Sequence, residues 1–378
     1  MCSARFVGGE SSKEGSIALA RWPCASRPTA QVEIDGSMLE GGGAIVRIAS
    51  ALSVLSGKPV RIHSIRAGRS QPGLRVQHLR SLEALLTLCG GKLDGGRLGS
   101  REIYFCPGET FESHIRVRIE TAGSVGLVLQ ALLVAMLAAR EITTAEISGG
   151  ATFGKYAPPV QYIQLVLLPL LKAMGCSAEI EIVRHGFYPV GGSLVRARVQ
   201  STGELRRLLL LEQGDVNAIE GVSIASRMLK KRQVAERQAR AATSVLENRG
   251  YRCGIKTSYV DSSCPGSGVV LAARTSTGCA LGADGLGEKG KPAKAVGRQA
   301  AKGLLRALES GSTVDEHMSD QVLPYLALAR GRSAVIAPSL TMHAKTNMTV
   351  ITEFVPVDFE LDPSGPNVRV ACAERCHG

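Results

Sequence analysis

The sequence predicts an α/β (α+β) protein in which a recurring α/β unit forms sheets faced by helices, with a second α/β region inserted late in the chain. Apolar helices that stop at glycine are repeatedly followed by short strands of alternating polarity. The chain has 378 residues, which is more than one compact core usually holds. Residues 212–308 interrupt the pattern with a charged helix and a glycine-rich run.

The first unit starts near Gln31. Residues 32–35 alternate between apolar and acidic side chains, as in a half-buried strand. A glycine-rich turn leads into a helix over 44–55, which ends at a Gly-Lys-Pro segment. A second strand is expected over 60–65.

The same order of elements recurs along the next stretch, although the repeats are too degenerate for the pattern alone to fix their number. The expected elements are a helix over 76–88, strands near 102–105 and 115–119, a buried helix over 125–139, a helix over 160–174 kinked at Pro169, and a strand over 178–183.

The remaining elements define the predicted division into domains. They are a charged helix over 230–247, a glycine-rich run over 278–291, a helical segment over 320–328, a strand over 333–337, a helix after Asn347 and a hairpin turning at 363–365. We expect an N-terminal extension over 1–30, a large domain over 31–211 and 309–378, and a small inserted α/β domain over 212–308, with boundaries good to about ten residues.

The composition limits the possible functions. Hydrophobic residues make up 44% of the chain and charged residues 21%, as in an ordinary soluble globular protein. The apolar stretch 125–139 is too short to span a bilayer, so no membrane association is expected. The net charge of +12 suits a polyanionic partner or simply solubility, and the 4% of aromatic residues argues against broad base-stacking platforms.

The ten cysteines show no Cys-x-x-Cys motif and no zinc spacing, so we expect reduced thiols in an intracellular protein. The first 30 residues lack the continuous apolar segment of a secretory signal. A cytoplasmic location is expected, with the nucleus or an organelle left open.

The first candidate for chemistry is the segment DGSMLEGGGAIVR over residues 35–47. Three glycines between a strand and a helix allow a close backbone approach, and free N–H groups at a helix start attract phosphate. Glu40 could hold a divalent cation, and Arg47 could meet phosphate oxygens. The alternative is a tight turn with a surface carboxylate. The segment is neither a dinucleotide-binding fingerprint nor a P-loop.

Two further segments carry candidate side chains. In SIRAGRSQPGLRVQH, residues 64–78, arginines cluster on a loop, which suits anion capture, although one or two could be solvated surface charges. His78 at the following helix start could serve only to cap or to pack. In PSLTMHAKTNMTV, residues 338–350, His343 stands between a strand and a helix. A neutral imidazole there could act as a nucleophile, although a lone histidine is more often structural.

Together these three segments resemble the RNA 3′-terminal phosphate cyclase family from about residue 31 to 361. Further matching stretches are TAGSVGLVLQ (121–130), APP (157–159), RHGFYPVGG (184–192), TSTGCALGADGLGEKGKPA (275–293) and DQVLPYLALA (320–329). The resemblance implies a large domain of three repeated α/β units with a smaller inserted α/β domain.

The resemblance also implies an ATP-dependent reaction on RNA that ends in a 3′-phosphate. His343 would attack ATP to form a covalent histidine-AMP with release of pyrophosphate. AMP would then pass to the RNA 3′-phosphate, and the 2′-hydroxyl would close a 2′,3′-cyclic phosphate and expel AMP. Phosphoryl-type transfer depends mainly on positioning and charge neutralisation, which fits an arginine-rich site.

By the same resemblance, each candidate side chain has an expected role. Glu40 would hold Mg²⁺ or Mn²⁺. The nucleotide- and phosphate-binding residues would be Arg47, Arg66, Arg69, Gln77, Gln130, Pro158, His317, Asp320 and Gln321.

The chain departs from the family pattern at three places. His317 replaces a common base-stacking tyrosine, GATF over 150–153 replaces a Gly-Gly-Thr-Asp/Asn motif, and Gln161 replaces an aspartate. These changes leave the exact RNA substrate open, together with the metal and the oligomeric state. The alternatives are a non-catalytic cyclase-like factor in ribosome biogenesis, whose members lack the motif histidine, and an enolpyruvyl transferase.

Overall fold

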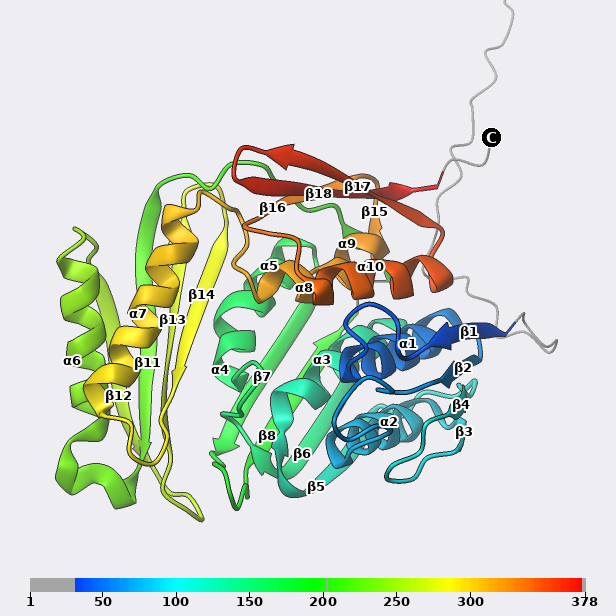
Figure 1. Cartoon of the computed structure of the whole chain (residues 1–378), viewed down its shortest axis with the longest axis horizontal. Helices are drawn as coiled ribbons and strands as arrows, with labels where there is room; N and C mark the ends of the chain where they lie inside the picture. Colours follow the sequence, from blue (N-terminus) through cyan, green and yellow to red (C-terminus); the bar gives the residue numbers. More distant parts are fainter. Residues whose placement is uncertain (1–30, 140, 202, 376–378) are drawn as a thin grey trace, which may run out of the picture.

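Four four-stranded sheets with helices packed on them form the described part of the chain, and they confirm the α/β class (Figure 1). The structure is a computed structural model that describes residues 31–139, 141–201 and 203–375. The predicted extension over 1–30 lies outside the described residues. A two-stranded sheet joins β9 (Leu205–Arg206) to β15 (Ala329–Arg330).

Three of the sheets share one topology: the strands lie in the order first, second, fourth, third along the chain, with the first two parallel and the other pairings antiparallel. The first has the order β1-β2-β4-β3, with β1 parallel to β2. Its elements are β1 (Val32–Asp35), α1 (Gly43–Ser56), β2 (Val60–His63), α2 (Val76–Cys89), β3 (Lys92–Asp94) and β4 (Ile103–Cys106). The helices and the first two strands lie close to their predicted positions, whereas β3 was not predicted.

The second sheet has the matching order β5-β6-β8-β7. Its strands are β5 (His114–Ser124), β6 (Thr143–Ala151), β7 (Ser177–Arg184) and β8 (Leu194–Gln200). The buried helix α3 (Val125–Ala135) continues as a 3-10 turn, η2 (Met136–Ala138).

The helix predicted over 160–174 consists of three consecutive segments. They are α4 (Val160–Tyr162), a π-helical turn η3 (Ile163–Leu167) and α5 (Leu168–Ala173). Pro169 has no N–H for the carbonyl four residues earlier. That carbonyl, on Leu165, instead accepts a short hydrogen bond from the Arg274 guanidinium. The carbonyl freed by the proline therefore contacts β13 (Ser267–Thr275), the strand that contains Arg274.

The third sheet, β10-β16-β18-β17, repeats the topology with strands from distant parts of the chain. Its strands are β10 (Leu209–Leu210), β16 (Ser333–Ala337), β17 (Val357–Ser364) and β18 (Asn367–Glu374). The helices are α8 (Met318–Gln321), α9 (Leu323–Leu328) and α10 (Met342–Phe354). The predicted C-terminal hairpin is confirmed.

The expected start of the last helix after Asn347 is wrong. Helix α10 begins at Met342 because the Thr341 hydroxyl caps it, accepting a 3.0 Å hydrogen bond from the Ala344 N–H. His343 therefore lies in the first helical turn rather than in the preceding loop.

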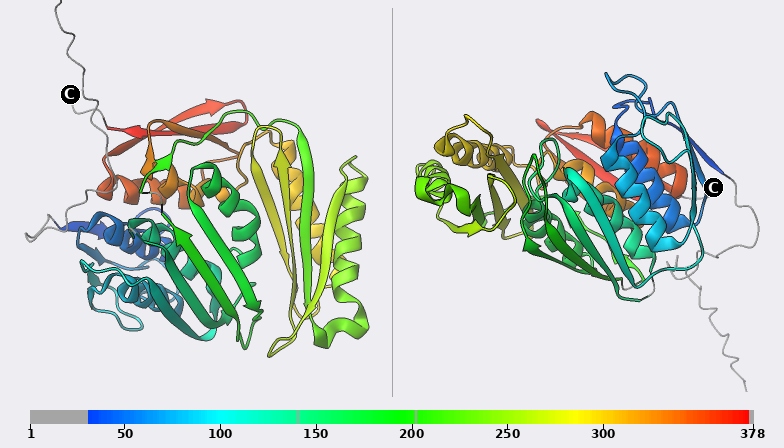
Figure 2. Two further views of the ribbon diagram at one scale, coloured as in Figure 1. Left: turned by 180° about the vertical axis from the view of Figure 1, so that it is seen from behind. Right: turned by 90° about the horizontal axis from the view of Figure 1, so that it is seen from below.

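The fourth sheet lies between β10 and α8 in the sequence. It has the order β12-β11-β13-β14. The elements are β11 (Val216–Ser226), η4 (Arg227–Arg232), α6 (Val234–Glu247), β12 (Cys253–Val260), β13 (Ser267–Thr275), β14 (Ala280–Leu286) and α7 (Ala293–Glu309). Helices α6 and α7 pack on each other and on this sheet at one end of the molecule, and β13 and β14 contact α4 and η3 (Figure 2). The division at 212 and 308 stays a prediction.

The core between the three similar sheets is made of helices. Helix α1 contacts α2, α3 and α10, so it packs against helices associated with all three sheets. Its apolar residues, such as Ile45 and Leu52, are fully buried. This packing brings the start of α1 next to the start of α10, although about 300 residues separate them.

Two features of the described residues concern the expectations about membrane association and cysteines. No helix among them is both long and apolar enough to cross a bilayer. The seven cysteines that the structure describes are free thiols.

Candidate active site

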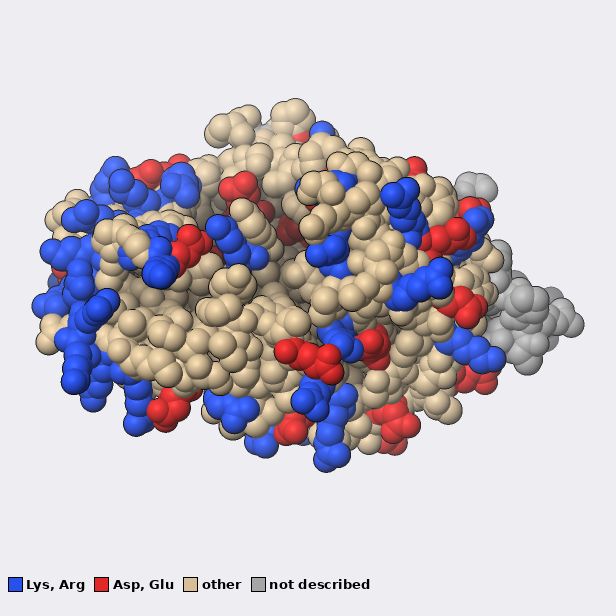
Figure 3. All heavy atoms as spheres, turned by 60° about the horizontal axis from the view of Figure 1, so that its bottom comes forward, with Lys and Arg blue, Asp and Glu red and all other residues tan. Residues whose placement is uncertain are grey.

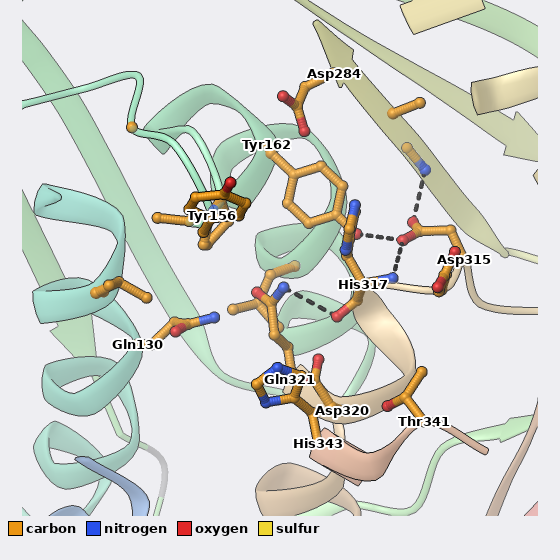
Figure 4. Close-up of a pocket in the computed structure, with 18 of the residues that line it drawn as sticks. Gln130, Tyr156, Tyr162, Asp284, Asp315, His317, Asp320, Gln321, Thr341 and His343 are labelled. Atoms are coloured by element: carbon orange, nitrogen blue, oxygen red, sulfur yellow. Dashed lines mark hydrogen bonds between the residues drawn. The ribbon is translucent and has the colours of Figure 1, made fainter. Parts of the chain in front are cut away.

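A cavity of about 840 Å³ lies where α1, α3, α8 and α10 meet β14 and α7. Its walls come from the helices that cover the first three sheets and from the fourth sheet with its helix α7. It collects seven of the eleven predicted site residues, several of which are labelled in Figure 4: Arg47, Gln130, Pro158, His317, Asp320, Gln321 and His343.

His343 presents its imidazole to this cavity from the first turn of α10. The side chain is 52% exposed, and its Nδ1 lies 3.8 Å from Oε2 of Glu40. A carboxylate favours a proton on the ring nitrogen that faces it. The other nitrogen, Nε2, then keeps a free lone pair, which is what a nucleophile requires.

Glu40 is held in place by three contacts and keeps one oxygen free. Its backbone N–H donates to the Thr346 hydroxyl at 3.2 Å, and the Arg69 guanidinium donates to its carbonyl at 2.9 Å and, more closely, to Oε1. Oε2 is buried, and no residue that the structure describes forms a hydrogen bond with it. The side chain is only 11% exposed, so this oxygen is a desolvated acceptor next to His343.

That free oxygen fits a divalent cation only if other ligands contribute. Among the described residues, no group of three or more His, Cys, Asp or Glu side chains is arranged to hold a metal. Mg²⁺ in nucleotide sites typically uses one or two carboxylates and completes its shell with phosphate oxygens and water. Glu40 therefore fits a metal that arrives with a nucleotide.

The glycines that follow Glu40 leave room for the chain's own side chains. A Cβ on Gly42 would overlap the Glu40 carboxylate, and a Cβ on Gly43 would overlap the His78 ring. Helix α1 begins at Gly43 with no side-chain cap and no acidic residue in its first turn. Its first N–H groups thus have no side-chain acceptor and suit an anion.

His78 is a cap, as one of the two sequence interpretations proposed. Its Nδ1 accepts a 3.0 Å hydrogen bond from the Arg75 N–H, which closes the start of α2. Burial, together with the charges of Arg47, Arg66 and Arg75, lowers the pKa of His78 to about 3, so its ring is neutral at physiological pH.

Arg47 and Asp320 line the cavity and carry ionisable groups of opposite charge. Burial lowers the pKa of Arg47 to about 10, partly offset by Asp320, so the guanidinium stays charged at neutral pH. Burial raises the pKa of Asp320 to about 6, although His343, His317 and Arg47 oppose the shift. Within the described residues Arg47 makes no ion pair, which leaves its charge available to a phosphate.

Asp315 was not predicted from the sequence, yet its carboxylate joins three parts of the site. It accepts hydrogen bonds from the Tyr162 hydroxyl at 2.6 Å, the Gly282 N–H at 2.8 Å and the His317 N–H at 3.0 Å (Figure 4). These donors come from α4, β14 and the turn before α8. The side chain is 2% exposed. Asp315 therefore fixes the His317 backbone relative to the fourth sheet.

His317, at the position of the family's tyrosine, is exposed in the cavity and packs edge-on against Tyr162, with ring centroids 6.4 Å apart. Gln321 donates a 3.0 Å hydrogen bond to the His317 carbonyl. Figure 4 shows the His317 ring beside the Tyr162 ring, on the lining of the cavity.

The other four predicted residues, Glu40, Arg66, Arg69 and Gln77, do not line the cavity, although Glu40 contacts it through His343. Arg69 acts on it through Glu40. Arg66 has a left-handed backbone (φ 54°) and donates to the Gln71 and Gly73 carbonyls, which shapes the arginine loop. Gln77 is half-buried on α2.

Two of the three departures from the family pattern lie outside the cavity lining. Gln161 is buried and faces His185, and Phe153 is buried against Phe187 with centroids 6.1 Å apart. Neither lines the cavity.

Several lining residues gave no separate sequence signal. Tyr156 is 92% exposed with a left-handed backbone (φ 58°), and Lys155 above its ring pairs with Glu288 at 3.5 Å. The pKa of Asp284 is raised to about 6 by burial. Tyr156 immediately precedes the APP motif, and Asp284 lies in the glycine-rich run. Their positions next to these motifs were the only sequence features that could have predicted their place in the site.

Comparisons with known proteins show which family the sequence matches. The sequence matches the family described as RNA 3′-terminal phosphate cyclase over residues 38–361. It is 43% identical over 336 residues to a Methanopyrus kandleri protein of that name, covering 87% of this chain and 95% of the relative. It is 46% identical over 332 residues to a Thermococcus onnurineus protein of the same name, covering 88% and 95%. A Pyrococcus furiosus relative, also so named, is 43% identical over 328 residues, covering 87% and 94%.

Proposed function

Since the chain belongs to the RNA 3′-terminal phosphate cyclase family, we propose that it converts an RNA 3′-phosphate into a 2′,3′-cyclic phosphate with ATP as co-substrate. The observation that carries the proposal is the pairing of His343 with Glu40 at the edge of a cavity containing Arg47. This arrangement combines a free imidazole nitrogen, a carboxylate and an unpaired cation, which are the groups that nucleotidyl transfer through histidine requires.

In the first step, Nε2 of His343 attacks the α-phosphorus of ATP. The N–P bond forms as the bond from that phosphorus to the bridging oxygen breaks, and pyrophosphate leaves. The ring then carries a positive charge with its proton on Nδ1, and the Glu40 carboxylate at 3.8 Å stabilises that charge. Arg47 and the uncapped start of α1 bind the phosphates.

In the second step, an oxygen of the RNA 3′-phosphate attacks the phosphorus of the bound AMP. The N–P bond breaks, His343 is regenerated and the RNA end carries a 3′-linked AMP. In the third step, the terminal 2′-hydroxyl oxygen attacks the 3′ phosphorus, loses its proton and expels AMP. Asp320, whose pKa is raised to about 6, is a candidate acceptor for protons released in the cavity.

The base of ATP would lie between the exposed His317 ring and Pro158, with Gln130 and Gln321 supplying polar contacts. Mg²⁺ or Mn²⁺ would be held by Oε2 of Glu40 together with phosphate oxygens and water. A bound divalent cation would neutralise charge that develops on the leaving pyrophosphate. Arg69 would keep the Glu40 carboxylate oriented toward that position.

The decisive experiment has two parts. Incubation with α-labelled ATP and MnCl₂ should give a protein-bound label that is acid-labile and sensitive to hydroxylamine, as expected for a phosphoramidate. A 3′-phosphorylated oligoribonucleotide should then become resistant to phosphatase. If neither product forms, the catalytic proposal fails and a non-catalytic member of the family becomes the better interpretation.

A further inference from the structure

Positive charge is concentrated in the part of the chain that forms the fourth sheet. Residues 212–308 contain 16 Lys and Arg but only 8 Asp and Glu, so they carry +8 of the chain's net charge of +12. Figure 3 shows the basic side chains gathered at the end of the molecule where α6 and α7 lie. Charge clustered on one face is typical of nucleic-acid-binding surfaces.

Helix α7 carries an ordered part of this charge. Its exposed basic residues recur every four positions: Lys294, Arg298, Lys302 and Arg306. We call these four residues the α7 stripe. Four helical residues advance about 6 Å along the axis and about 40° around it, so the stripe winds gradually over about 18 Å. Its last member, Arg306, lines the candidate active-site cavity.

The α7 stripe has no internal counter-charge. None of its members forms an ion pair with a described residue, whereas other exposed arginines do, such as Arg61 with Glu33 at 2.9 Å. Like charges four residues apart on a helix repel each other and destabilise the helix. Lys294 also lies in the first turn, where the helix dipole disfavours a cation. The arrangement is unfavourable for the protein alone and becomes favourable beside a polyanion.

We infer that the α7 stripe binds successive backbone phosphates of the RNA upstream of its 3′ end, leading that end into the cavity at Arg306. The inference rests on the proposed function, because that function makes an RNA chain the substrate. Phosphate contacts carry no sequence information, so the stripe would bind RNA of any sequence. The scarcity of aromatic residues fits binding through charge rather than base stacking.

The first experiment measures RNA binding by the protein in the absence of catalysis. The triple variant Lys294→Gln, Arg298→Gln, Lys302→Gln keeps good helix formers at exposed positions and leaves Arg306 intact. Anisotropy of a labelled 20-nucleotide RNA with a 3′-hydroxyl gives the affinity between 50 and 200 mM KCl. Each lost contact lowers the salt slope by about 0.7 for a single strand. Over this range wild-type affinity should therefore fall roughly 20-fold more than that of the variant.

A matched control neutralises three other exposed arginines that lie outside the cavity and form no ion pair within the described part of the chain: Arg116, Arg118 and Arg198 on β5 and β8. This control should keep the wild-type salt slope.

Cyclisation by the α7 variant should show a raised KM for a 3′-phosphorylated 20-mer but an unchanged KM for a dinucleotide 3′-phosphate.

The possible outcomes separate the two proposals. If the salt slope of the α7 variant equals that of the wild type, or if the control loses as much slope, the stripe is not the RNA track. If the variant instead loses binding only to phosphatidylserine vesicles, the stripe is a membrane surface and the inference is overturned. If wild-type protein binds RNA through the stripe but forms no histidine-AMP, the proposed function fails while the surface assignment stands.

Discussion

Replacing Glu40 by Gln should slow the formation of the histidine-AMP by removing one charge while keeping the size of the side chain. Two unit charges 3.8 Å apart, the observed separation of His343 Nδ1 and Glu40 Oε2, interact by about 1 kcal/mol in bulk water and about 4 kcal/mol at an effective dielectric constant of about 20. Because His343 is half-exposed, we expect the lower part of this range, about 1–2 kcal/mol. That corresponds to a rate roughly 5- to 30-fold slower.

The rate of label incorporation from α-labelled ATP should be measured at saturating ATP across a MnCl₂ titration. Since Glu40 is also the proposed metal ligand, the variant should need more Mn²⁺ to reach its half-maximal rate. Glu33→Gln is the control, because this carboxylate is exposed on β1 and pairs with Arg61. Equal rates for Glu40→Gln and wild type at every Mn²⁺ concentration would refute both roles of Glu40.

Four further predictions follow from the same structure. His343→Asn should abolish the labelled adduct but leave the urea midpoint unchanged, because the ring is half-exposed; an adduct of normal yield would remove His343 from the mechanism. Asp315→Asn should lower the free energy of unfolding by about 1–3 kcal/mol, since an amide cannot accept every hydrogen bond that the carboxylate accepts; an unchanged urea midpoint would contradict this. The pKa of Asp320 is raised to about 6, so between about pH 4 and pH 6 the folded state binds more protons than the unfolded state. The stability that protonated Asp320 contributes is therefore lost as pH rises through that window. At pH 7 the Asp320→Asn variant should accordingly have a higher urea midpoint than wild type, while its adenylation slows. A lower midpoint would show that the ionised Asp320 carboxylate does not destabilise the folded state. His185 is buried with its pKa lowered to about 4, so wild-type stability should fall by up to about 3 kcal/mol as pH drops from 6.5 toward 4; His185→Phe should flatten that dependence, and an identical slope would count against it.

The local pattern of the sequence predicted most elements of the large body because each depends on neighbouring residues. The helices α1 and α2 end where glycines adopt left-handed backbones, at Gly57 and Gly90, and these stops are visible in the sequence. The strands β3, β6 and β8 were not predicted. Strand β3 has only three residues and gives a weak local signal, whereas β6 and β8 alternate between buried and less buried residues, a periodicity that the prediction missed.

The start of α10 shows how a local rule can be missed. Thr341 is a good cap, but Met342, His343 and Lys345 give little apolar periodicity, so the sequence favoured a later start. One hydrogen bond from the Ala344 N–H fixes the helix start and thereby directs His343 toward the cavity.

The sequence alone identified the α/β class, the glycine-rich loop with Glu40, the arginine loop and His343, because each is a short run of residues whose chemistry does not depend on distant partners. Only the tertiary structure decided that Glu40 faces His343, that Gly42 and Gly43 make room for the chain's own side chains, and that Asp315 joins α4, β14 and the turn before α8. Those arrangements depend on contacts between residues up to 306 positions apart, such as the hydrogen bond from the Glu40 N–H to Thr346. Packing of the helices around α1 creates such contacts, and no local periodicity encodes them.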